Sequence, residues 1–150
     1  MTQHIIDPLL TEQAELIVED EVSANPTLRD CMLTDVTCMS DDTKRVILSA
    51  MLKMHKEIAD YCGDLDVSLN SIEEIAENTE AWYVILDAGS TPEIRGVRYH
   101  YKANWETSHG VEVVVINGDQ VRFVGNCGYF SSLEGLMNRD DDEFNYLEFA

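Results

Sequence analysis

The stretch RGVRYHYKANWETSHGVEVVVINGDQVRFVG, residues 95–125, predicts the fold of this chain. Its first part alternates strictly, as a β-strand with one buried face does. The side chains expected on the buried face are Val97, Tyr99, Tyr101, Ala103 and Trp105. Those expected on a wet, basic face are Arg98, His100, Lys102 and Asn104. The valine-rich part that follows is typical of a β-hairpin, because Asn-Gly is a strong turn signal.

Two turns through Asn117-Gly118 fit this hairpin. A two-residue type I′ turn places Phe123 opposite Glu112. A three-residue loop with a left-handed glycine places Phe123 opposite Val111 and Arg122 opposite Glu112. The second register gathers the apolar side chains on one face, and a one-residue slip would move them all to the other. We therefore predict the three-residue loop.

Helical spacing dominates the first half of the chain. The clearest helix covers residues 40–63, with Ser40 as its N-cap and two broad apolar stripes. His55 and Cys62 lie within a stripe, which favours a core histidine over a metal ligand and a reduced core thiol.

Residues 11–23 are predicted to form a helix that ends before Asn25-Pro26. Residues 68–79 are predicted to form a shorter helix, capped by Asn70 or Ser71. The pattern of residues 28–39 fits either a helix or a strand.

These elements predict an α+β fold, with N-terminal helices packed on one face of a C-terminal antiparallel β-meander. A length of 150 residues matches a single domain, 1–150. Residues 1–80 are expected to be mainly helical and residues 81–150 mainly antiparallel sheet. The tail after residue 130 is expected to hold a short helix, an acidic loop and an apolar end.

The charge balance is strongly acidic: 29 acids against 10 bases give a net charge of −19. Such a surface repels nucleic-acid phosphates and anionic lipid and attracts basic partners. We therefore expect a basic protein partner, no direct nucleic-acid binding and no membrane association. The N-terminal residues lack the basic start and apolar run of a signal sequence, which indicates a cytoplasmic protein.

Motifs that carry chemistry are missing from the sequence. It holds no nucleophile elbow, no zinc-protease helix, no phosphate loop and no dinucleotide fingerprint. Neither the histidines nor the cysteines have metal-ligand spacing, and acidic residues 64–77 fail the pattern of a calcium loop. His100 and Glu112 are able to meet across neighbouring strands, as many pairs in a sheet do. The sequence therefore predicts no enzyme, no cofactor and no metal.

One segment carries a resemblance: Trp105-Glu106-Thr107-Ser108-His109-Gly110, followed by a valine-rich hairpin that closes on Val124-Gly125. It resembles the C-terminal half of a family of small uncharacterised bacterial proteins. Members often lie beside polymorphic-toxin genes, and some are treated as immunity proteins. Ser108 departs from the glutamate that the family carries, which weakens a chemical role for the motif.

The motif residues also have structural interpretations. Trp105 continues the apolar face of its strand, so we expect it in the core. Gly110 permits a positive φ, and Glu106 or His109 is suited to bind the amides of the loop.

We infer three candidate functions from the sequence. The first is an acidic immunity-type binding protein that neutralises a cognate bacterial toxin by masking a basic surface. Its contacts are expected among acids of the N-terminal half or at Asp140, Asp141, Asp142 and Glu143. The second is a DNA mimic that inhibits a nucleic-acid enzyme. The third is a small metal-dependent hydrolase centred on Glu106 and His109, with His100 nearby.

Overall fold

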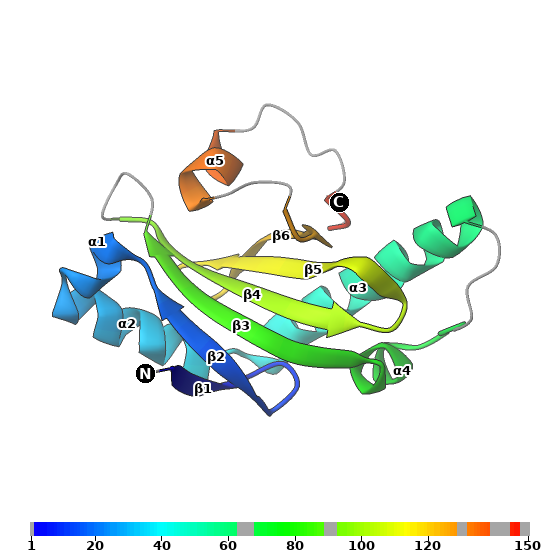
Figure 1. Cartoon of the computed structure of the whole chain (residues 1–150), viewed down its shortest axis with the longest axis horizontal. Coiled ribbons are helices and arrows are strands. Elements are labelled where there is room, and N and C mark those ends of the chain that lie inside the picture. Colours follow the sequence, from blue (N-terminus) through cyan, green and yellow to red (C-terminus); the bar gives the residue numbers. More distant parts are fainter. Residues whose placement is uncertain (1, 63–67, 89–92, 129–131, 139–144, 148–150) are drawn as a thin grey trace.

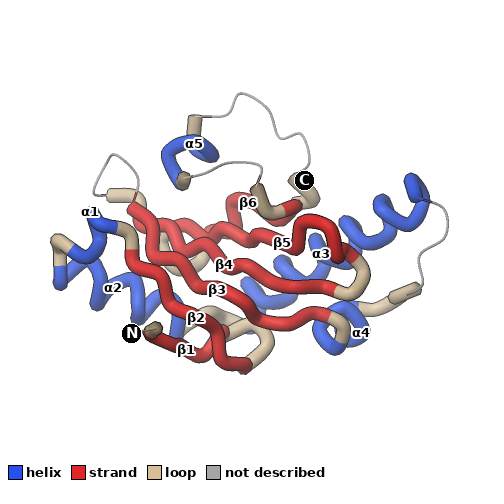
Figure 2. Tube along the Cα trace, in the orientation of Figure 1, coloured by secondary structure: helices blue, strands red, loops and turns tan. Residues whose placement is uncertain are grey.

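A computed structural model of the chain describes residues 2–62, 68–88, 93–128, 132–138 and 145–147. They form an α+β structure in which helices flank a six-stranded sheet (Figures 1 and 2). In chain order the elements are β1 (Gln3–Asp7), β2 (Glu12–Val18), α1 (Asp20–Ser23), α2 (Pro26–Thr37), α3 (Asp41–Cys62), α4 (Ile72–Glu77), β3 (Thr79–Ala88), β4 (Arg95–Ala103), β5 (Glu106–Ile116), β6 (Gln120–Asn126) and α5 (Leu133–Met137).

The strands lie in the sheet in the same order as in the sequence. All neighbours are antiparallel except β2 and β3, which are parallel. Helices α1–α4 form the crossover between these two strands, because parallel neighbours need a long connection. Figure 1 shows α2 and α3 behind the sheet, and the main core lies between them and the strands.

The predicted fold class is confirmed, but the predicted order of elements is wrong. Residues 3–18 form strands β1 and β2, so the sheet begins at the N-terminal end of the chain and the helices lie in the middle. The helix predicted over residues 11–23 is a strand for most of its length. Ala14, Leu16 and Val18 face the core on alternate positions, and pairing of β2 with β3 selects this period over the helical one.

The other predicted helices are present. Ser40 caps α3, since its Oγ accepts a hydrogen bond from the amide of Thr43 at 3.1 Å. Ser71 caps α4 in the same way, at 3.1 Å from the amide of Glu74. The ambiguous segment 28–39 belongs largely to helix α2. No helix among the described residues is both long enough and apolar enough to cross a membrane.

His55 is a core histidine, as predicted. It is 2% exposed, and its Nε2 accepts a hydrogen bond from the amide of Leu69 at 3.0 Å. Its ring packs edge-on against Trp105, with 5.8 Å between centroids. Burial lowers the pKa of His55 because the apolar surroundings disfavour the imidazolium form.

The β5–β6 loop has the predicted length but not the predicted position. Ile116 pairs with Gln120, so the loop residues are 117–119. Asn117 and Gly118 both have positive φ, 52° and 88°, which explains the Asn-Gly pair.

The predicted register of this hairpin is wrong, and so is the type I′ alternative, because Phe123 lies opposite Val114. A β-bulge after Val114 shifts the ladder. Every residue from Val111 to Ile116 is buried, so both faces of β5 are covered. Burial of a single face therefore gives no basis for choosing the register.

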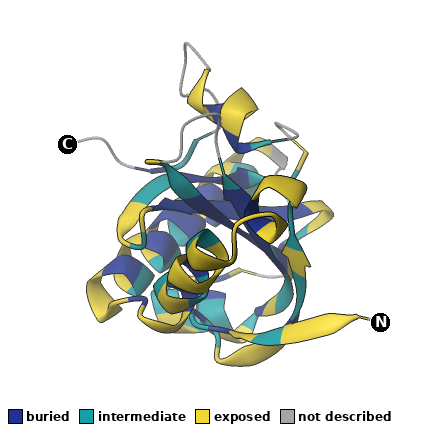
Figure 3. Cartoon of the chain, turned by 90° about the vertical axis from the view of Figure 1, so that its left-hand side faces the viewer, coloured by how far each residue is buried: buried dark blue, intermediate teal, exposed yellow. Residues whose placement is uncertain are grey.

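The cover on the second face of the sheet is α5. Its Leu133 and Leu136 pack on a separate small core with Phe123 of β6. Figure 3 shows buried residues on both sides of the strands at this end. The face of β4 that carries Arg98 was predicted to be exposed to solvent. This prediction is wrong at Arg98, which is only 6% exposed.

We expect Gly110→Ala to destabilise the protein by at least about 2 kcal/mol in urea unfolding. Gly110 has φ +76°, and a Cβ there would lie 2.7 Å from the carbonyl oxygen of Tyr101. Gly128 is a matched control, because its φ is +91° but a Cβ would meet nothing within 4 Å. Gly128→Ala should cost only about 1 kcal/mol from backbone strain. Equal losses in the two variants would contradict the close contact at Gly110.

Candidate functional site

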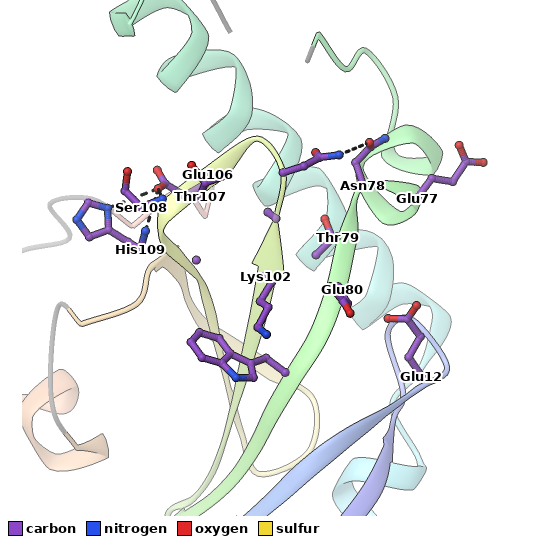
Figure 4. A pocket seen from close by; sticks show the side chains of 14 residues that line it. Glu12, Glu77, Asn78, Thr79, Glu80, Lys102, Glu106, Thr107, Ser108 and His109 are labelled. Atoms are coloured by element: carbon purple, nitrogen blue, oxygen red, sulfur yellow. Dashed lines mark hydrogen bonds and ion pairs between the residues drawn. The ribbon is translucent and has the colours of Figure 1, made fainter. Parts of the chain in front are cut away.

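An open groove of ≈ 740 Å³ lies at the end of the sheet where β4 turns into β5 (Figure 4). One side comes from the start of β2 and from the junction of α4 with β3, and the other from the β4–β5 corner. Its lining residues are Glu12, Glu77, Asn78, Thr79, Glu80, Trp82, Lys102, Ala103, Asn104, Glu106, Thr107, Ser108, His109 and Gly110.

A bulge in β3 supplies the aromatic side chain of the groove. Ala81 pairs with Tyr101 and Tyr83 with His100, so Trp82 is the extra residue. Such bulges re-aim a side chain, and Trp82 lies on the same face as Tyr83, with ring centroids 4.8 Å apart. The ammonium of Lys102 lies 5.1 Å from the centre of the Trp82 ring, a cation–π contact.

The β4–β5 corner is held by Glu106. Its Oε1 accepts hydrogen bonds from the amides of Ser108 and His109, both at 3.1 Å. Nδ1 of His109 lies 3.5 Å from the same oxygen, while the imidazole side chain is 62% exposed. The role predicted for Glu106 in binding loop amides is confirmed, and the acid and the histidine of the motif are neighbours.

Beneath the groove, polar contacts join α4, β3 and the β4–β5 turn. The side-chain amide of Asn104 donates to Asn78 at 2.7 Å. The indole of Trp105 donates to the hydroxyl of Thr79 at 3.2 Å, and that hydroxyl donates to the carbonyl of Ile75 at 2.6 Å. Trp105 is 2% exposed, so its predicted place in the core is confirmed. These contacts fix the backbone that carries the groove side chains.

The charge of the groove is negative. Glu12, Glu77, Glu80 and Glu106 line it, against the single lysine Lys102. One carboxylate oxygen of Glu12 already has a partner, because its Oε1 accepts a hydrogen bond from the amide of Ala81 at 3.0 Å. Glu77 and Glu80 are exposed at the rim. Clefts lined by one sign of charge concentrate the field, so this one attracts cationic groups.

A second cluster of charges is buried on the same face of the sheet, toward α5. The guanidinium of Arg98 lies between Glu112, at 2.7 Å, and Asp87, at 3.3 Å. Asp87 also accepts from the amide of Leu133 at 2.9 Å and thereby ties α5 to the sheet. The sequence predicted Glu112 opposite Arg122 in the hairpin. In the structure Glu112 is fully buried, lies opposite Gly125 and forms an ion pair with Arg98.

His100 and Glu112 lie next to each other on neighbouring strands, as predicted. Nε2 of His100 lies 2.9 Å from Oε2 of Glu112. Neither Nε2 of His100 nor Oε1 of Glu112 has a hydrogen-bond partner among the described residues.

Neither cluster has the features of a metal or thiol site. Within the described residues, no three histidine, cysteine, aspartate or glutamate side chains are placed to hold a metal ion. Burial raises the pKa of Cys127 to about 12, with the nearby carboxylate of Glu112 adding to the shift. A thiol with such a pKa is protonated at neutral pH and is a poor nucleophile.

The structure describes only some of the predicted site residues. Glu106, His109 and Gly110 border the groove, whereas Asp140, Asp141, Asp142 and Glu143 lie outside the described residues. Sequence reasoning missed Trp82 and the carboxylates of β2, α4 and β3 in the groove, since these come together only through the parallel β2–β3 pairing and the bulge.

Comparison with known proteins found no matching family model, and no curated protein or solved structure matched the chain significantly. The family resemblance of residues 105–110 therefore stays a prediction.

Proposed function

We propose that this protein is an acidic binding protein of the immunity type, which neutralises a basic toxin by covering its active surface. The observation that carries the proposal is the groove, which is lined by four carboxylates, a partly exposed tryptophan and one lysine. Three of these carboxylates, Glu12, Glu77 and Glu80, belong to the N-terminal half, which is one of the two regions where the sequence predicted the contacts. The other region, residues 140–143, lies outside the described residues.

The negative charge and the tryptophan ring have different roles in binding. The overall charge of −19 steers a basic partner and raises its association rate, an effect that salt screens. Trp82 offers apolar area for affinity, as tryptophans at the centre of interfaces often do. Its place on a rigid strand lowers the entropy cost of ordering it on binding.

Reversing two rim charges tests the proposal. The variant Glu77→Lys/Glu80→Lys is expected to weaken binding to the product of the neighbouring gene by about tenfold or more, measured by calorimetry. Both side chains are exposed, so the loss of stability should be small. It is expected to come from Glu80→Lys, because position 80 lies opposite Lys102 in the β3–β4 ladder.

The matched control is Glu93→Lys/Asp119→Lys. These exposed acids lie in the loops at the opposite end of the sheet, and the substitution changes the net charge by the same amount. It should reduce the association rate slightly and leave the dissociation rate unchanged. Failure of the neighbouring product to bind the native protein, or equal loss in the two variants, would refute the groove as the binding surface.

A further inference from the structure

We propose that the groove recognises an arginine side chain of the basic partner, whose guanidinium takes the place of Lys102 over the ring of Trp82. This inference rests on the proposed function and names the chemical group that the groove binds. Guanidinium groups are planar and weakly hydrated, so they stack on aromatic rings and pair with carboxylates through two parallel hydrogen bonds. An aromatic ring beside available carboxylates offers both kinds of contact.

The groove already holds one cation, which belongs to the chain itself. The ammonium of Lys102 lies 5.1 Å from the centre of the Trp82 ring, within the range of a cation–π contact. In the β3–β4 ladder Lys102 lies opposite Glu80, yet it forms no ion pair with any described residue. Figure 4 shows the side chains of Lys102 and Glu80 in the groove. The cation thus lies over the aromatic ring although a carboxylate occupies the facing position.

Two of the four carboxylates are available to a ligand. Glu77 and Glu80 are exposed, and neither side chain forms an ion pair or a hydrogen bond with another described residue. Glu12 and Glu106 already accept hydrogen bonds from backbone amides. An incoming cation therefore meets unpaired negative charge and an aromatic ring, and both contacts favour a guanidinium over an ammonium.

Lys102 is suited to leave the ring when the partner binds. It is exposed, and its flexible four-carbon stem lets the ammonium move into solvent. Its charge acts on a cationic ligand in two ways, because it competes for the ring and repels the ligand. Lys102 therefore weakens the binding of every cation to the groove, and only a ligand with a stronger affinity for the ring displaces it.

The test uses three small amides that differ in the end of the side chain: N-acetylarginine amide, N-acetyllysine amide and N-acetylcitrulline amide, which has the shape of arginine without its charge. Each is added to the whole protein, and the NMR signal of the Trp82 indole N–H is followed. The indole of Trp105, which is 2% exposed, is the internal reference. The arginine amide should shift the Trp82 signal to saturation, the lysine amide should bind about fivefold more weakly, and the citrulline amide should have no effect.

Two matched variants test the role of Lys102. Lys102→Gln should strengthen binding of the arginine amide about threefold, because it removes the competing cation. Lys56→Gln changes the net charge equally at an exposed position of α3 that does not line the groove, and it should leave binding unchanged. An unchanged Trp105 signal shows that each variant is folded.

The inference is wrong if the citrulline amide shifts the Trp82 signal as much as the arginine amide does, if the lysine amide binds equally well, or if Lys102→Gln does not strengthen binding. Calorimetry with the product of the neighbouring gene separates the inference from the proposed function. If that product binds and the arginine amide does not, the guanidinium site is wrong and the proposed function stands. If the arginine amide binds and the product does not, the site stands and the proposed function is wrong.

Discussion

Arg98→Met is expected to destabilise the protein by about 3–5 kcal/mol. The substitution leaves Glu112 and Asp87 buried without the guanidinium that lies between them. A buried carboxylate that loses its cation retains its desolvation cost, which is why breaking such a pair costs more than the pair contributes. Urea unfolding of the native and variant proteins measures the loss.

Two further variants separate the lost charge from lost packing. Arg98→Met/Glu112→Gln removes one of the stranded charges, so it should be more stable than Arg98→Met alone. Arg45→Met removes an arginine that pairs with Asp42 at the surface, at 3.4 Å, and should cost about 0–1 kcal/mol. A double variant no more stable than the single one would show that the charges are not coupled.

Trp105→Ala should cost about 3–5 kcal/mol, the range for truncating a buried tryptophan. The variant loses the edge contact with His55 and the hydrogen bond to Thr79, and it opens a cavity under the groove. Thermal and urea unfolding should both show the loss.

The second tryptophan is the natural control. Trp82→Ala removes a partly exposed ring whose cation–π contact is with Lys102, so it should cost about 1 kcal/mol or less. We expect Trp82→Ala to reduce partner binding with little loss of stability. A large loss of stability in Trp82→Ala, or none in Trp105→Ala, would contradict these assignments.

Local signals in the sequence were sufficient for several elements. Serine caps and apolar stripes predicted α3 and α4, and strict alternation predicted β4 with its buried tyrosines. The alternation of Ala14, Leu16 and Val18 was also present in β2, but the same residues fit a helical pattern. Short amphipathic segments are ambiguous in this way, because pairing with a distant strand decides between the two periods.

The candidate site was predictable only at its corner. The motif Trp105–Gly110 showed a buried ring, a positive φ and an acid suited to loop amides, and each feature depends on neighbours in sequence. Glu12, Glu77 and Trp82 reach the same groove from three different elements. No pattern in the sequence around these residues indicates that they line one groove.

The sequence by itself determined the acidic character, the α+β class and the local ends of the helices, because charge, periodicity and caps act over a few residues. Only the tertiary structure decided the register of β6, the burial of Arg98 with two carboxylates and the place of β1 at one edge of the sheet. The physical reason is that these features depend on what covers each face and edge of the sheet. That cover comes from segments far apart in the chain: α5 over the second face and residues 145–147 along β6.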